Sequence, residues 1–147
     1  MQPCLDPFPV DPRNPLSLNA AASRIASFVG LSEILVVNAT GKSQRVAGTI
    51  EHDTPGDASY IEISRDMLRF PESVLATIAH EVTHAYMRTR GVDLGGTDLP
   101  GMYENEILTD VCAVFIGLGK LLLNGTIRVR RTQDSAINLR EQSEFLQ

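Results

Sequence analysis

Hydrophobic positions follow two different periods along the chain, and each period predicts a different kind of element. Between residues 17 and 29 they recur three and four positions apart, which predicts a short amphipathic helix that ends at Gly30. The residues that follow contain β-branched or alternating stretches bounded by turn residues, which predicts three strands. These strands are expected over residues 32–40, over 44–52 and from residue 59 onward.

The helical period returns in the second half of the chain. A helix is predicted over residues 71–90, with Pro71 in its first turn, and a second long helix is predicted from about 103 to 123. A glycine-rich loop, residues 91–101, separates the two. This order of elements predicts an α+β fold, in which a small, mostly antiparallel sheet packs against the two long helices.

Length and composition fit one soluble domain. The chain has 147 residues, of which 43% are hydrophobic and 21% are charged. We expect a single domain over residues 16–125, preceded by a proline-rich extended segment over residues 1–15. The tail over residues 126–147 stops without a clear terminal element, as expected for a truncated chain.

Charge and cysteine content narrow the class of protein. A net charge of −5 gives no reason to expect binding to nucleic acid or to an anionic membrane. The two cysteines, Cys4 and Cys112, do not form a disulfide framework, and the N-terminus lacks the basic and apolar regions of a secretory signal. The longest apolar run, residues 111–123, is too short to span a bilayer. We therefore expect a cytoplasmic protein, and its oligomeric state stays open.

Candidate chemistry begins with the sequence AHEVTHAYM, which spans residues 79–87 in the first long helix. Side chains four positions apart lie on one helix face, so His80 and His84 can direct ring nitrogens at one point. Zinc takes ligands about 2.0–2.1 Å away in a tetrahedral array, and two imidazoles fill two corners. Glu81 lies about 100° round the helix, where it can reach a water at the metal. Taken alone, the five residues of this motif also fit surface histidines on an amphipathic helix.

The second long helix supplies what two histidines lack. It contains the sequence NEILTD, in which Glu106 and Asp110 again lie four positions apart. One carboxylate can complete the ligand set, while another can orient a ligand histidine through its second ring nitrogen. We therefore expect Glu106 at the metal and Asp110 beside His80 or His84. The loop between the helices is long enough for the second helix to return antiparallel to the first.

The pair of motifs HEVTH and NEILTD resembles the gluzincin branch of zinc metallopeptidases, the thermolysin clan. The resemblance covers roughly residues 45–123 and is closest to small, largely uncharacterised bacterial proteins that carry both motifs. It implies a minimal zincin-like fold with Zn²⁺ bound by three side chains and a catalytic glutamate. Carried over residue by residue, the metal ligands are His80, His84 and Glu106, the catalytic base is Glu81, and Asp110 supports a ligand histidine.

The sequence departs from the larger thermolysin-like enzymes in one respect. No histidine follows His84, so the downstream histidine that helps to hold the transition state in those enzymes has no counterpart. Tyr103 lies one turn before Glu106 and is the nearest substitute as a catalytic residue. It fits equally well an aromatic side chain that packs at the start of a helix.

Two other acidic residues are alternative third ligands. Glu104 precedes Asp110 by six positions and lies off its face, whereas Asp98 belongs to a GGTD sequence similar to that of zincins with an aspartate ligand. Cys112 lies about 240° round the helix from Glu106 and is expected in the core rather than at the metal.

These residues predict a zinc-dependent peptidase that hydrolyses a peptide or protein substrate with a metal-activated water. Glu81 would take a proton from the water and pass it to the leaving amine, and strand 44–52 would be the open sheet edge that an extended substrate can join. The alternative is a non-catalytic, zinc-bearing regulatory or binding domain. The missing transition-state donor favours this alternative. The presence of Glu81 disfavours it, because a purely structural site has no need of a base. A 2-His-1-carboxylate iron site is a third hypothesis with the same weakness.

Overall fold

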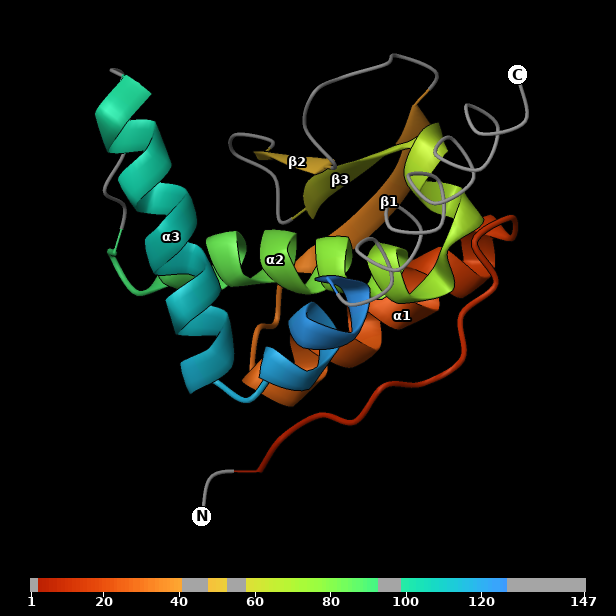
Figure 1. Ribbon diagram of the computed structural model, residues 1–147, viewed down its shortest axis with the longest axis horizontal. Helices are drawn as coiled ribbons and strands as arrows, with labels where there is room; N and C mark the ends of the chain where they lie inside the picture. The colour runs from red at the N-terminus through yellow and green to blue at the C-terminus, as the bar shows by residue number, and fades with distance from the viewer. Residues whose placement is uncertain (1–2, 41–47, 53–57, 93–98, 127–147) are drawn as a thin grey trace, which may run out of the picture.

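The computed structural model of the protein describes residues 3–40, 48–52, 58–92 and 99–126. Its elements follow the predicted order of one helix, three strands and two further helices, with a short 3-10 helix before the second α-helix (Figure 1). In chain order they are α1 (Pro15–Val29), β1 (Ile34–Thr40), β2 (Gly48–His52), β3 (Ala58–Ser64), η1 (Arg65–Arg69), α2 (Pro71–Thr89) and α3 (Leu99–Phe115). This content confirms the α+β class.

The sheet is mixed, so the prediction of a mostly antiparallel sheet is wrong. Its strand order is β1-β3-β2, with β1 parallel to β3 and β2 antiparallel to β3. Ile61 in the central strand pairs with Val37 on one side and with Ile50 on the other. Strands that follow one another usually lie side by side, but here β2 occupies the far edge and the chain then returns between the first two strands. Among the strands that the structure describes, β2 therefore lies at a sheet edge, as predicted.

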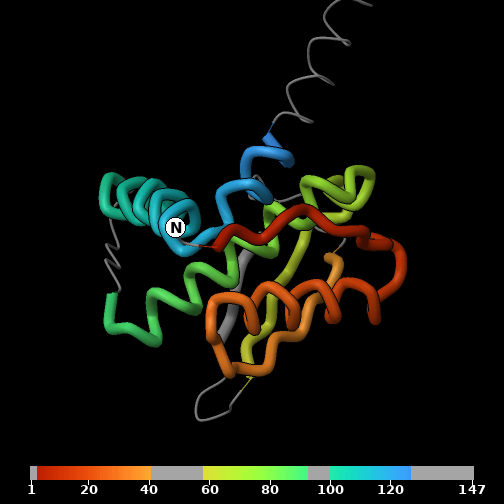
Figure 2. Tube along the Cα trace, turned by 90° about the horizontal axis from the view of Figure 1, so that it is seen from below, coloured from red at the N-terminus to blue at the C-terminus, as the bar shows by residue number. Residues whose placement is uncertain are grey.

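The core lies between one face of the sheet and helices α1 and α2, which lie on the same side of the strands (Figures 1 and 2). Alternate residues of β1 and β3 point toward these helices and are buried, whereas Ile34 and Tyr60 on the opposite face are exposed. The inward-facing apolar side chains are Leu35, Val37, Ile61 and Ile63. Each stabilises the fold by roughly 1.5–3 kcal/mol when fully buried, so a shift of register by one residue would be costly.

Helix α2 lies where the sequence predicts it and is fixed at both ends. Pro71 and Glu72 occupy its first turn, where proline loses no helical hydrogen bond and an acidic side chain faces the positive end of the helix dipole. Near its end, Arg88 donates to the two carboxylate oxygens of Glu33 at 2.8 and 3.2 Å. Glu33 also accepts a hydrogen bond from Ser59 in β3. The C-terminal part of α2 is thereby tied to the sheet.

The second long helix, predicted over residues 103–123, differs from the prediction at both ends. Helix α3 begins earlier, within the stretch predicted to be a loop, and ends at Phe115. The chain then turns at Gly117, whose φ is +96°, and residues 119–126 are helical again. Glycine adopts this φ readily, and a Cβ at Gly117 would collide with the carbonyl oxygen of Pro3. The chain thus contacts the distant N-terminal segment just after α3 ends. No local sequence pattern reveals this contact.

The N-terminal segment, residues 3–14, lies extended across the helices (Figure 2). Its Leu5 amide donates to the carbonyl oxygen of Gly117 at 2.9 Å, and the guanidinium carbon of Arg24 lies 4.2 Å from the ring centre of Phe8. Residues 3–11 contain no helix or strand, and the segment ends in a turn in which the Asn14 amide donates to the carbonyl oxygen of Asp11 at 3.1 Å.

The helical segment 119–126 contacts α2. A Cβ at Gly125 would lie 2.5 Å from the Cβ of Ala76, so the absence of a side chain permits this close approach. Gly125 is itself helical, so the chain remains helical beyond residue 123, where the predicted helix ends. The rest of the predicted tail, residues 127–147, lies outside the described residues. None of the described helices is long and apolar enough to cross a membrane.

Candidate metal centre

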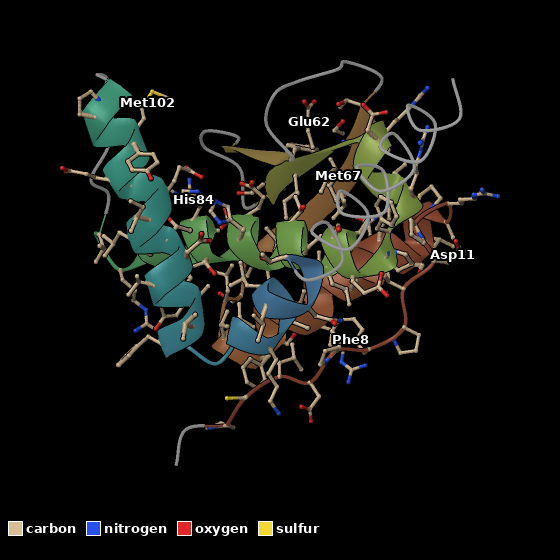
Figure 3. The ribbon with its side chains drawn as sticks, viewed as in Figure 1. Phe8, Asp11, Glu62, Met67, His84 and Met102 are labelled. Atoms are coloured by element: carbon tan, nitrogen blue, oxygen red, sulfur yellow. The ribbon has the colours of Figure 1, made fainter. Side chains whose placement is uncertain are left out.

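The two predicted motifs meet where α3 crosses the C-terminal half of α2 (Figure 3). Helix α2 presents His80 and His84 on one face, because four positions make slightly more than one helical turn. Helix α3 presents Glu106 and Asp110 by the same spacing. Two carboxylates from one helix therefore face two imidazoles from the other.

Three donor atoms converge at this crossing. The Nε2 atoms of His80 and His84 lie 3.1 Å apart, and the Glu106 carboxylate oxygens lie 2.9 Å from the first and 3.2 Å from the second. Two ligands held 2.0–2.1 Å from a tetrahedral zinc ion are about 3.3 Å apart, so these separations leave room for a small divalent cation. His80, His84 and Glu106 thus form a group that could hold a metal ion.

The second ring nitrogen of each histidine has a partner on α3. Nδ1 of His80 lies 2.8 Å from a carboxylate oxygen of Asp110, and Nδ1 of His84 lies 3.3 Å from the hydroxyl oxygen of Thr109. The expectation that Asp110 supports a histidine leaves two choices open, and the structure selects His80. Thr109 is the residue that sequence reasoning missed; its only signal is its position between Glu106 and Asp110 in the motif.

The two histidines differ in their affinity for protons. Burial lowers the pKa of His80, but its hydrogen bond to Asp110 and the charges of Glu81, Glu106 and Asp110 outweigh burial and raise the pKa overall. Burial and the charge of His80 lower the pKa of His84, and Glu106 opposes this only in part. Protons and a metal ion compete for the same ring nitrogens, so metal affinity should fall as pH falls.

Glu81 is buried beside this cluster, with only 5% of its surface exposed. Burial raises the pKa of its carboxyl to about 7; the charge of His80 lowers the pKa and that of Glu106 raises it further. A carboxyl group with a pKa near neutrality can both accept and return a proton at physiological pH. Such perturbation is typical of an acid–base residue, although buried structural carboxyls also show it.

The remaining candidates do not join the ligand group. Tyr103 lies on α3 but is 69% exposed, so its predicted catalytic role stays a prediction. Glu104 is exposed and Cys112 is half-buried, and neither belongs to the three-residue group found among the described side chains. Cys112 lies outside the ligand group as expected, but it is not among the core residues, so its predicted place in the core is wrong. Asp98 lies outside the described residues.

Comparisons with known proteins add no relative to this picture: no family model, no curated protein and no solved structure matches the chain. The resemblance to gluzincins therefore stays an expectation that rests on the two sequence motifs alone.

Proposed function

We propose that the protein is a zinc-dependent peptidase of minimal gluzincin type. The observation that carries this proposal is the convergence of His80, His84 and Glu106 next to the buried carboxyl of Glu81. Two imidazoles and one carboxylate form a ligand set used by catalytic zinc sites, which keep a fourth position for water or substrate. A carboxyl group that is not a ligand has no purpose in a site that serves only stability.

The described side chains divide the work as follows. His80, His84 and Glu106 would hold the zinc ion, which would supply a Lewis acid that lowers the pKa of water and polarises a carbonyl group. Glu81 accepts a proton from the attacking water at a carboxylate oxygen and later gives it to the leaving amine. Asp110 accepts a hydrogen bond from Nδ1 of His80, which leaves the Nε2 lone pair directed toward the metal. The cleavage is a hydrolysis, so it needs no redox partner.

Strand β2 (Gly48–His52) suggests how a peptide would be held. It pairs with β3 on one side, forms an edge of the described sheet, and is the edge strand that contacts α2. An extended peptide can add to such an edge through main-chain hydrogen bonds, which hold it irrespective of its sequence. A bound peptide would then run above the helix that carries Glu81 (Figure 1).

A non-catalytic metal-bearing domain is the second candidate. The exposure of Tyr103 favours it, because a peptidase needs a donor that faces the developing oxyanion, and this phenol is largely in solvent. The two candidates share their metal ligands and differ in whether Glu81 acts on a substrate.

The deciding experiment replaces Glu81 with glutamine, which keeps its shape and removes the basic oxygen. Turnover should fall by about 10²–10⁴, the usual contribution of a general base, while the zinc content stays at one per chain. Cleavage of a mixed peptide library, followed by mass spectrometry, measures turnover without a known substrate. The matched control is Glu104→Gln, an exposed carboxylate on α3 outside the ligand group.

Undiminished cleavage by the Glu81→Gln protein would overturn the proposed mechanism. If neither protein cleaves any peptide while both bind zinc fully, the non-catalytic candidate is favoured instead.

A further inference from the structure

Thr109 belongs to α3, on the side of this helix that faces α2, and its side chain is completely buried. Its hydroxyl oxygen lies 2.7 Å from the carbonyl oxygen of Asn105 and 3.3 Å from Nδ1 of His84. The first contact is a common one, since buried threonines in helices often bond to the carbonyl four residues earlier. The second contact is not, because it reaches from α3 to a candidate ligand on α2.

The direction of these hydrogen bonds follows from the chemistry of the partners. A carbonyl oxygen only accepts, and an oxygen–oxygen distance of 2.7 Å without a proton between the atoms would be repulsive, so Thr109 donates to Asn105. A hydroxyl has one proton, which leaves its lone pairs for His84. The contact between Thr109 and His84 therefore favours a proton on Nδ1 of His84, donated to the hydroxyl oxygen, over one on Nε2, where Glu106 is the competing acceptor.

A neutral histidine with its proton on Nδ1 has its lone pair on Nε2. Nε2 of His84 is the atom that lies 3.1 Å from Nε2 of His80 and 3.2 Å from Glu106. At His80, Asp110 produces the same result through its bond to Nδ1. The adjacent residues Thr109 and Asp110 thus act on one histidine each.

We propose that Thr109 is a positioning residue that holds His84 in the Nδ1–H tautomer, so that its Nε2 lone pair faces the metal. This role rests on the proposed metal site. It adds to that proposal the groups that support the second histidine: Nδ1 of His84 donates to the Thr109 hydroxyl, which in turn donates to the carbonyl oxygen of Asn105. A fixed tautomer and ring orientation raise metal affinity, because no rearrangement is needed on binding.

The chain offers a matched control in Thr83. It is also completely buried, on α2, and its hydroxyl donates to the carbonyl oxygen of Ala79 at 2.7 Å. Replacing Thr83 with valine removes the same kind of helical bond without removing the contact to His84. Any effect of lost packing or of a lost carbonyl partner should therefore appear in both valine variants.

The test reads the tautomer of His84 in the metal-free protein, from the two-bond ¹H–¹⁵N correlations of its ring at about pH 8, above the usual histidine pKa. Wild type, Thr109→Ser and Thr83→Val should show the Nδ1–H form. Thr109→Val should show a mixture with the Nε2–H form, which is the commoner tautomer of an unconstrained histidine. Zinc affinity, measured by competition with a chelator, should fall about tenfold or more in Thr109→Val and recover in Thr109→Ser.

An unchanged tautomer in Thr109→Val would overturn the proposal, and so would an equal loss of zinc affinity in Thr83→Val. If Thr109→Val does not fold, Thr109→Ala removes the same hydroxyl with less bulk and carries the same expectations. A wild-type protein that binds no zinc would refute the metal site instead. The tautomer comparison needs no metal, so it still decides whether Thr109 orients His84.

Discussion

Helices α2 and α3 each carry half of the candidate metal centre, but the fold holds them in different ways. Helix α2 is buried along most of its length, and Arg88 ties its end to Glu33 beside the sheet. Among the described side chains of α3, only Thr109 and Ala113 are buried. Its outer side exposes large apolar residues, namely Met102, Tyr103, Ile107, Val111, Val114 and Phe115.

This difference indicates how the two halves of the site are positioned. His80 and His84 lie on a helix that is part of the main layer of packing, since α2 contributes most of its inward-facing apolar side chains to the core. Glu106 and Asp110 lie on a helix with few buried side chains, and both make polar contacts with His80. A bound metal ion would therefore act as a cross-link that holds α3 against α2.

Loss of a ligand should have the largest effect, whichever helix carries it. We expect about one zinc ion per chain in the wild-type protein and none after His80→Ala, His84→Ala or Glu106→Ala, since two remaining ligands hold zinc weakly. Elemental analysis of the purified proteins measures this, with Glu104→Ala as the α3 control that keeps its metal. Full zinc occupancy in the Glu106→Ala protein would show that Glu106 of α3 is not a metal ligand. One iron per chain without zinc would favour the 2-His-1-carboxylate hypothesis.

Glu81 provides a test of burial on the α2 side. Its pKa is raised from 4.5 to about 7, so the folded metal-free protein binds this proton more tightly than the unfolded chain. The resulting stability is fully present below pH 4.5 and is lost as pH rises from 4.5 toward 7, by about 3 kcal/mol in all. The Glu81→Gln protein has no such proton to lose. Between pH 4.5 and 7 its free energy of unfolding should therefore rise by this amount relative to that of the wild-type protein. Urea unfolding with a chelator present measures the difference, and a constant difference would show that Glu81 is not desolvated.

Asp110 tests the α3 side, where the carboxylates are more exposed. Asp110→Asn weakens the acceptor for Nδ1 of His80 but leaves the three metal ligands in place. Zinc affinity should fall by roughly 10–100-fold without being abolished, as expected for a group that orients a ligand. Titration against a chelator of known affinity gives the value. Unchanged affinity would mean that Asp110 does not support His80, and complete loss would indicate direct ligation.

The smallest expected effect is a difference in amide hydrogen exchange between α2 and α3 of the wild-type protein. Without metal, amide hydrogens of α3 should exchange faster than those in the buried part of α2, because undocking α3 exposes little apolar surface. Free zinc at about ten times its Kd should slow exchange in α3 about tenfold, since undocking must then release the metal. Hydrogen–deuterium exchange resolved by peptide measures both helices, and equal exchange in metal-free α2 and α3 would remove the proposed difference.

The sequence by itself determined the local part of this site. Four residues make slightly more than one helical turn, so His80 with His84, and Glu106 with Asp110, share a helix face in any fold that keeps the helices. The same geometry places Glu81 off the ligand face. The order of elements and the bounds of α2 also followed from local patterns, because periodicity, proline and glycine act within a few residues of themselves.

The tertiary structure decided everything that depends on distant parts of the chain. The return of β3 between β1 and β2 made the sheet mixed, although the strand patterns alone suit either pairing. The N-terminal segment meets the chain at Gly117, beyond the end of α3, within what the pattern predicts to be one long helix. The way the two helices cross assigned Asp110 to His80 and Thr109 to His84. These choices are fixed by packing between residues far apart in sequence, and hydrophobic periodicity carries no information about such pairs.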